Sequence, residues 1–438
     1  MAPSIAIMGA GPAGLTLARL LQVADLEVSI TVFEKDVSPT ARSHQGGTLD
    51  LHPESGLAAV KKAGLWDEAS KYLRYDAEEL FITDKNNTVL THMKEVEKLS
   101  SAAEYARPEI DREDLKEVLL KSVKPELIRW GKTLQSVNED STGATLTFPD
   151  GSTEGPFDLI VGADGAWSKV RAVLTDVRPR YSGICGFECA ISTTSGHYPR
   201  ISKMVGMGSY FSFSNHKGLT AQRMGNGSLK IGMWVTREES YPGDLLSAYG
   251  DDEEKLKSKI LENYHGWAPE LLQCVRAGMN FRPWPLYELP VGHTWDHKPG
   301  FTLIGDAASL MTPWAGEGVN KAMKDALELA ESLEQALKSG QEMDEATRKY
   351  EANMFPRAKR VQTLTQQNKI AMFSDNGAVN LMVSMVEVVA MEMGKDLNAG
   401  WLAWIPFRTL MFCYASCLQV LGIWRRKVGD WLFTSPSS

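Results

Sequence analysis

The first 34 residues constrain the fold more than any other part of this chain. An apolar run at residues 5–8 leads directly into the glycine-rich segment 9–14, with the sequence GAGPAG, and then into apolar residues at helical spacing. A second apolar run at residues 28–33 ends in Glu34. This order of strand, glycine turn, helix, strand and acid is the dinucleotide-binding fingerprint. We therefore predict a Rossmann-type unit at the start of the chain.

Each glycine of that fingerprint, and the acid that follows, has a physical task. Gly9 permits the tight turn, Gly11 lets a pyrophosphate approach the free N–H groups of the helix N-terminus, and Gly14 lets the helix pack close to the sheet. Glu34 stands where a carboxylate accepts hydrogen bonds from the adenosine ribose. The alternative is a glycine turn that binds nothing, but the strand before it, the helix after it and the acid favour a dinucleotide site.

Length, charge and cysteine content narrow the class of protein. A chain of 438 residues exceeds the usual size of one domain, so we expect two lobes. The net charge of −8 argues against nucleic acid as a partner. Five cysteines without a CxxC pair indicate neither a disulfide framework nor a metal site, and we interpret Cys185 and Cys189 as core residues on one helix face. The early first strand leaves no room for a signal peptide, which predicts a cytoplasmic protein.

Two later segments repeat the pattern of a buried strand that enters a glycine turn. Residues 157–161 lead into GADG at 162–165, and residues 301–304 lead into GDAA at 305–308 and PWAGEGVN at 313–320. A long helix follows, from about Val319 to Lys338. Residues 180–290 lack this alternation, and their period-two runs predict an antiparallel sheet. We also predict a helix at 56–70, a hairpin at 80–90 and a helix with Asp111 as its N-cap.

These three turns, in this order, resemble the class A flavoprotein monooxygenases over roughly residues 4–375. GGTLDLH at 46–52, PEIDR at 108–112 and SKVR at 168–171 are similar to segments of the tetracycline-inactivating flavin monooxygenases. The resemblance implies an α/β (overall α+β) fold, with a glutathione-reductase-like FAD-binding Rossmann domain, an antiparallel-sheet substrate domain and C-terminal helices. It places FAD-binding parts at 1–75, 106–178 and 291–375, substrate-domain parts at 76–105 and 179–290, and a helical, apolar extension at 376–438.

The resemblance also implies FAD as a bound cofactor and NADPH as a transient one. Arg42 would lie on the NADPH approach, Asp164 in the motif used for both cofactors, Asp306 at the ribityl and pyrophosphate part, and residues 316–319 around the isoalloxazine. A single dinucleotide fingerprint agrees with transient NADPH contact. The expected cofactor-binding residues are Gly9, Gly11, Ala13, Gly14, Glu34, Lys35, Arg42, Asp50, Arg112, Asp164, Asp306, Pro313, Gly316, Glu317, Gly318, Val319 and Asn320.

The reaction implied is oxygenation of a fairly apolar aromatic or polycyclic small molecule, with NAD(P)H and O2, through a C4a-hydroperoxyflavin. Such an enzyme would serve secondary metabolism or detoxification. Glu188 and Ser209 stand where the family has substrate-contacting residues, and Trp314 either stacks on substrate or packs against the neighbouring helix. No protein nucleophile or metal is expected. His44 and His52 are either acid/base groups or, as we favour, loop histidines with satisfied hydrogen bonds.

Two alternatives remain open at the level of the sequence. One is an FAD-dependent oxidase or dehydrogenase on the same fold, and the other is a non-catalytic flavin-binding protein attached to a membrane. The second arises from residues 401–427, where aromatic and apolar residues precede the basic cluster Arg425-Arg426-Lys427. The favoured interpretation of the same stretch is a C-terminal helix docked on the core or over the substrate cavity.

Overall fold

A computed structural model describes residues 2–41, 46–94, 106–140, 143–192 and 198–392, together with Tyr414 and Cys417. The chain divides into two compact units. The first comprises Met1–Tyr75, Lys98–Ser182 and Tyr287–Thr365, and the second comprises Asp76–Glu97, Gly183–Leu286 and Gln366–Ser438. The domain boundaries expected from the sequence stay proposals. Within the described residues, every helix is too short or too polar to span a bilayer, and the segment 401–427 lies almost wholly outside those residues.

The first unit is built on a five-stranded parallel sheet. Its strand order is β17 (Phe301–Leu303), β11 (Leu159–Gly162), β1 (Ser4–Met8), β2 (Ser29–Glu34) and β7 (Ile128–Trp130). Each strand pairs in parallel with its neighbours. Apolar residues occupy both faces of β1, as a sheet covered on both sides requires, and Ile5, Ala6 and Ile7 are fully buried. The predicted Rossmann-type α/β unit is confirmed.

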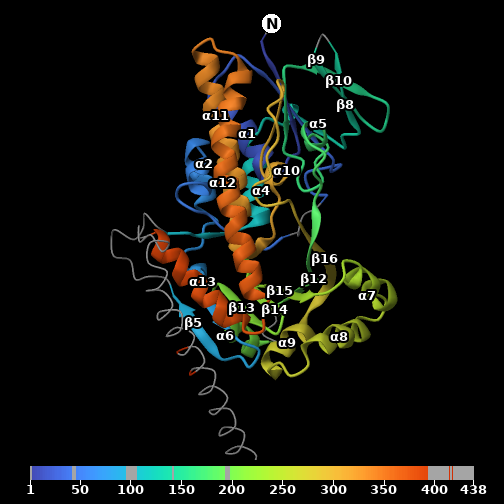
Figure 1. Cartoon of the computed structure of the whole chain (residues 1–438), viewed down its shortest axis with the longest axis vertical. Coiled ribbons are helices and arrows are strands. Elements are labelled where there is room, and N and C mark those ends of the chain that lie inside the picture. Colours follow the sequence, from blue (N-terminus) through green and yellow to red (C-terminus); the bar gives the residue numbers. More distant parts are fainter. Residues whose placement is uncertain are drawn as a thin grey trace, which may run out of the picture. The chain divides into compact units, whose positions relative to one another are not determined.

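Helices pack on this sheet around one hydrophobic core. The glycine turn opens α1 (Pro12–Val23), which packs against the long α11 (Gly318–Lys338); both are labelled in Figure 1. The remaining elements that begin in this unit are α2 (Gly56–Lys62), α3 (Trp66–Ala69), α4 (Arg112–Ser122), α5 (Arg171–Leu174), α10 (Asp306–Ser309), the 3-10 turn η5 (Pro313–Ala315), α12 (Met343–Met372), and strands β3 (Thr48–Asp50), β6 (Glu109–Asp111), β8 (Ser136–Asp140), β9 (Gly143–Thr147) and β10 (Thr153–Phe157).

One local prediction for this unit is wrong, and a second is confirmed in position only. The helix predicted over 56–70 is broken into α2 and α3, because Gly64 adopts a positive φ of 67° between them. Asp111 does precede α4, as predicted, but its carboxylate makes no capping hydrogen bond. It accepts a hydrogen bond from the Arg74 guanidinium at 2.5 Å instead, because a charged donor outcompetes a backbone amide.

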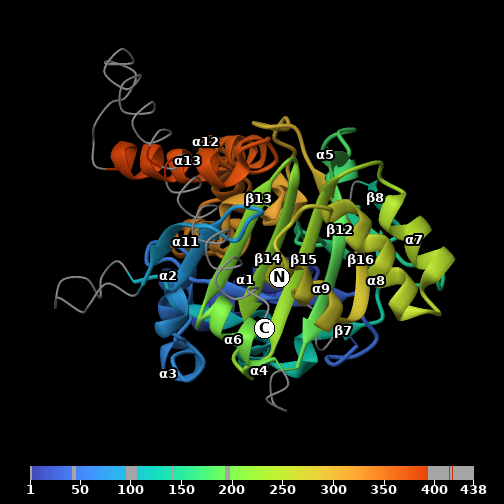
Figure 2. The same cartoon turned by 90° about the horizontal axis from the view of Figure 1, so that it is seen from below.

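The second unit contains a seven-stranded sheet. Its order is β16 (Met279–Glu288), β12 (Arg180–Ile191), β15 (Leu229–Thr236), β14 (Lys217–Arg223), β13 (Ser209–Ser214), β4 (Leu80–Thr83) and β5 (Val89–Met93). Figure 2 shows β12 to β15 side by side. The predicted antiparallel sheet and the β4–β5 hairpin are confirmed, although β13 and β4 pair in parallel. The sequence did not predict four helices of this unit, which are α6 (Pro199–Val205), α7 (Tyr241–Tyr249), α8 (Glu253–Leu261) and α9 (Pro269–Ala277). It did predict a helical segment from residue 376 onward, where α13 (Gly377–Glu392) lies.

Cys185 and Cys189 of this unit are core residues as predicted, but they do not lie on a helix. Cys185 and Cys189 lie on β12, where residues four apart share a face just as they do on a helix. Both are buried, as is Cys274 on α9. Burial raises the pKa of the Cys274 thiol to about 12, so this thiol stays protonated and unreactive at neutral pH.

Candidate functional site

The glycine turn after β1 combines two crowded positions with one open position. A Cβ placed on Gly9, whose φ is +109°, would lie 2.4 Å from the Ala163 carbonyl oxygen. One placed on Gly14 would lie 2.0 Å from the Gly9 carbonyl oxygen. At Gly11 no atom lies within 4 Å of the added carbon. Packing therefore requires Gly9 and Gly14, whereas Gly11 leaves the helix N-terminus accessible to a ligand.

Glu34 connects the end of β2 to this turn. Its Oε2 accepts a hydrogen bond from the Ala10 N–H at 2.6 Å, and its Oε1 accepts one from the Asp36 N–H at 2.9 Å. The Glu34 side chain is only 7% exposed, whereas the adjacent Lys35 is exposed. Two backbone donors thus hold the carboxylate beside the turn, where the fingerprint requires it.

The turn after β11 brings Asp164 beside the first glycine turn. Asp164 Oδ2 accepts a hydrogen bond from the Lys169 N–H at 2.7 Å, while Oδ1 has no hydrogen-bond partner among the described residues. Burial raises the pKa of this carboxyl. Buried Arg171 donates to the Ala166 carbonyl at 2.6 Å and to the Ala307 carbonyl at 3.0 Å. It therefore connects the turn after β11 to the one after β17.

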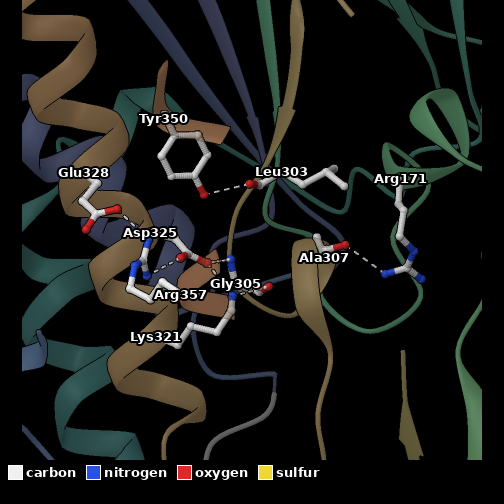
Figure 3. A network of polar contacts seen from close by, with 9 residues as sticks. All are labelled: Arg171, Leu303, Gly305, Ala307, Lys321, Asp325, Glu328, Tyr350 and Arg357. Atoms are coloured by element: carbon white, nitrogen blue, oxygen red, sulfur yellow. Dashed lines mark hydrogen bonds and ion pairs between the residues drawn. The ribbon is translucent and has the colours of Figure 1, made fainter. Parts of the chain in front are cut away.

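A buried ion-pair network fixes the turn after β17. Gly305 has a φ of +64°, and its N–H donates to Asp325 Oδ2 at 2.9 Å. Its carbonyl accepts a hydrogen bond from Lys321 Nζ at 3.2 Å. Arg357 holds the other Asp325 oxygen at 2.9 Å, and Figure 3 shows all of these side chains converging on Gly305. Both backbone polar groups of the glycine are thus satisfied by α11, which leaves the turn little freedom.

Asp306 follows this fixed glycine at the start of α10. The residue as a whole is exposed, but its carboxyl lies close enough to other protein groups that desolvation raises its pKa, and the charges of Lys321 and Arg112 partly offset this effect. A Cβ at Gly305 would contact the Ala13 Cβ at 3.2 Å, so the third turn packs against the first. The three glycine turns of the sequence therefore converge at the carboxyl edge of the sheet.

Residues 313–320 form the segment that leads into α11. Pro313, Gly316 and Gly318 are exposed, whereas Glu317 and Val319 are half-buried. The Trp314 side chain is 7% exposed; it is packed in the protein, and its contact with a substrate stays a prediction. Buried Asn320 donates from Nδ2 to the Asp50 carbonyl at 2.8 Å, and its Oδ1 accepts from the His52 N–H at 2.9 Å.

Asp50 and Arg112 border the small β3–β6 sheet. Asp50 Oδ1 would lie 3.5 Å from a Cβ on Gly316, so the carboxylate faces the segment expected to hold the isoalloxazine. The Arg112 side chain is exposed and passes over Gly46, where an added Cβ would meet the Arg112 Cδ at 2.5 Å. Arg42 lies outside the described residues, so its expected role on the NADPH approach stays a prediction.

Glu109 is a half-buried acid in this small sheet whose role the sequence does not predict. It lies directly opposite Asp50 in the antiparallel register. Burial, together with the charge of Asp50, raises its pKa to about 7, although Thr48 Oγ1 donates to Glu109 Oε2 at 2.6 Å. Like charges placed opposite each other are unfavourable, which favours the protonated form of Glu109.

In the second unit, the sheet brings Glu188 and Ser209 onto one face. Ser209 pairs with Gln222, Gln222 with Lys230, and Lys230 with Ala190, which is two residues from Glu188. Directly paired residues, and residues two apart on a strand, share a face. Lys230 Nζ lies 2.8 Å from Glu188 Oε1. We call Ser209, Gln222, Lys230 and Glu188 the polar row.

Among the residues that the sequence did not predict for the site, only one pair stands at unusual positions in the sequence. Lys321 and Asp325 stand four apart, among the apolar positions of a helix, which is unusual for charged residues. Gln222 and Lys230 carried no signal, because only strand register brings them beside Ser209 and Glu188. His52 lies in a loop and has hydrogen-bond partners, as predicted, and its side chain is 2% exposed.

Comparison with known proteins agrees with this geometry. The family model described as "FAD binding domain" matches residues 3–239 and 292–365. "Monooxygenase asqM" of Emericella nidulans is 32% identical over 434 residues, covering 85% of this chain and 96% of that protein. "3-amino-4-hydroxybenzoate 2-monooxygenase PtnB3" of Streptomyces platensis is 27% identical over 370 residues, covering 82% of this chain and 86% of that protein.

A solved structure with the same fold is that of tetracycline destructase Tet(51). It superposes with a TM-score of 0.62 at 17% sequence identity, covering 88% of this chain and 98% of that chain. The chain belongs to the FAD-binding-domain family and, within it, to the class A flavin monooxygenases. The flavoprotein class expected from the three glycine turns is thereby confirmed.

The residues present fit FAD. The open position at Gly11 admits a pyrophosphate to the N-terminus of α1. Glu34 is held beside the same turn by backbone amides, and Asp164 keeps a buried oxygen without a hydrogen-bond partner among the described residues. The exposed glycines of the 313–320 segment leave the backbone of the α11 N-terminus accessible. These are the features that an extended dinucleotide needs.

Proposed function

We propose that the protein uses NAD(P)H and O2 to oxygenate a fairly apolar aromatic or polycyclic small molecule on its bound FAD. The observation that carries the proposal is the convergence of the three glycine turns, with Gly11 open and Asp306 exposed at their meeting point. The similarity to a 3-amino-4-hydroxybenzoate monooxygenase supports an aromatic substrate.

The protein's contribution in this proposal is binding and orientation. Bound FAD would supply the redox and oxygen chemistry, which amino-acid side chains alone do not provide. The amides around Gly11 would hold the pyrophosphate, Glu34 the ribose and Asp306 the ribityl region. The N-terminus of α11, with its free N–H groups, would favour negative charge on the flavin ring edge.

Substrate recognition is assigned to the polar row of the second unit. Its members offer a hydroxyl, an amide, an ammonium and a carboxylate on one sheet face. A few polar groups on an otherwise apolar surface are what fixes the orientation of an aromatic ligand. The proposal also includes transient binding of NADPH, with Arg42 and Asp164 as contacting residues.

An oxygen-isotope experiment tests it. The purified protein, NADPH and a panel of aromatic and polycyclic compounds are incubated under 18O2, and products are identified by mass spectrometry. The proposal predicts that one panel class gains a single 18O atom with NADPH consumption of one equivalent per product. A product formed without the label, with hydrogen peroxide released instead, would favour the FAD oxidase. FAD bound without turnover of any compound would favour the non-catalytic flavin-binding protein.

A further inference from the structure

His52 is a buried histidine held between two carboxylates at the candidate cofactor site. It follows β3, and its side chain is 2% exposed. Its Nε2 lies 2.7 Å from Asp50 Oδ2, and its Nδ1 lies 3.4 Å from Glu317 Oε1. Because each ring nitrogen faces an acceptor, only the imidazolium form can donate toward both.

The charges around His52 favour the imidazolium. Burial lowers the pKa of the imidazole, but the hydrogen bond to Asp50 and the charges of Asp50 and Glu317 outweigh it, and the resulting pKa is raised above 6.5. Arg107 opposes this effect. The negative charge of Glu54 helps to raise the pKa of Glu317, and the negative charge of Asp50 helps to raise the pKa of Glu109.

The two carboxylates belong to different parts of the site. Asp50 ends β3, whereas Glu317 precedes the first residue of α11 and directly follows Gly316. Asn320 joins the same two parts through hydrogen bonds to the Asp50 carbonyl and the His52 N–H. The start of α11 is therefore tied to the end of β3 by one neutral amide and one titratable imidazole.

We propose that His52 is a positioning residue for FAD, which in its protonated form holds residues 316–318 against Asp50 in the arrangement that binds the flavin. When the proton leaves, Glu317 loses its partner and the carboxylates of Asp50 and Glu317 repel each other. FAD affinity then falls as the pH rises. This inference rests on the proposed role of residues 316–320 in holding FAD.

The test is the pH dependence of the FAD dissociation constant. Full-length protein freed of flavin is titrated with FAD from pH 6 to pH 9, and binding is followed by flavin fluorescence. The wild-type constant is expected to rise by about tenfold across this range, a usual size for coupling between a proton and a ligand. His52→Gln should bind weakly at pH 6 and show a flat profile.

His297 provides the matched control. It is another histidine that bridges two carboxylates, Glu351 at 2.6 Å and Asp344 at 2.9 Å, and both of these lie on α12 rather than in residues 313–320. His297→Gln should lose thermal stability and yet keep the wild-type pH profile of FAD binding. Glu109→Gln is a second control, because the pKa of Glu109 is also near neutrality. This variant should also keep the pH dependence of FAD binding.

Glu317→Gln keeps the test decisive if His52→Gln fails to fold. Because it removes one of the two negative charges, it should move the midpoint of the profile to lower pH. A flat wild-type profile, or a pH dependence that survives in His52→Gln or disappears in Glu109→Gln, would overturn the inference while leaving FAD binding intact. A wild-type protein that binds no FAD at any pH would refute the proposed function instead.

Discussion

The Lys321 ammonium lies 2.5 Å from the Asp325 carboxylate, and the two side chains are 2% and 0% exposed. These residues, one helical turn apart on α11, hold the carbonyl and the N–H of Gly305 respectively. Asp306, the next residue, is the acid expected at the ribityl and pyrophosphate part of FAD. The most buried ion pair of this network thus supports the turn that presents a cofactor-binding residue.

Breaking that pair should destabilise the protein strongly. Asp325→Asn would leave the buried charge of Lys321 without its partner and weaken the contact to Arg357, at a cost of about 3–5 kcal/mol in the free energy of unfolding. Lys338→Met removes an exposed ion pair with Glu334 on the same helix and should cost less than about 1 kcal/mol. Urea unfolding of the two variants measures the difference. Equal losses would mean that the buried network does not hold this turn.

Gly11 and Gly14 should respond differently to alanine. Gly11→Ala should leave the thermal stability of the flavin-free protein nearly unchanged, because the added methyl meets open space. It should weaken FAD binding by about tenfold or more, as expected when one or two backbone hydrogen bonds to the pyrophosphate are lost. Gly14→Ala should fail to fold stably, since its Cβ would lie 2.0 Å from the Gly9 carbonyl oxygen. Tight FAD binding by Gly11→Ala would exclude pyrophosphate contact at this residue.

Glu109 should make stability depend on pH. Its pKa is raised from 4.5 to about 7 in the folded protein, so the folded state binds the proton more tightly than the unfolded state. Its contribution to stability is therefore full below pH 4.5 and is lost as the pH rises to about 7. At pH 8, Glu109→Gln should be more stable than wild type by up to about 3 kcal/mol, the equivalent of this pKa shift. Urea unfolding at pH 5 and pH 8 checks this, and a variant no more stable at pH 8 would contradict it.

The polar row should affect substrate binding rather than cofactor binding. Lys230→Met removes the ammonium beside Glu188 and should raise KM about tenfold, the effect of one lost charge-assisted hydrogen bond. FAD affinity should stay at the wild-type value. Lys257→Met, which removes an ion pair with Glu253 on α8 of the same unit, is the control and should leave KM unchanged. If both variants alter KM equally, the row has no special role in recognition.

The sequence predicted the parts of this fold whose signals are local. The first 34 residues predict a glycine turn, and the structure shows why glycine is needed there. A Cβ at Gly9 or at Gly14 would clash with a backbone carbonyl oxygen. Hydrophobic periodicity predicted α11 and the antiparallel strands because each follows from neighbouring residues. The break at Gly64 was missed because a glycine within a helical pattern only weakens a helix prediction, and whether it ends the helix depends on tertiary packing.

The parts that were not predicted depend on contacts between distant residues. His52 lies beside Glu317 where Asn320 joins α11 to the end of β3, and nothing within either segment of the sequence signals the other. Glu109 faces Asp50 through strand register. Asp111 precedes its helix as predicted, but Arg74 claims its carboxylate. In each case the local sequence predicts the secondary structure around the residue, whereas its role depends on a residue that only folding brings beside it.

The most direct test of the central claim is an absorption spectrum of the purified protein, recorded before and after NADPH is added without air. We predict the bands of oxidised flavin at the start, their loss on NADPH addition, faster loss with an aromatic compound that binds, and their return when air is admitted. A colourless protein that FAD does not reconstitute would contradict the cofactor site. A yellow protein that NADPH never bleaches would contradict the monooxygenase cycle.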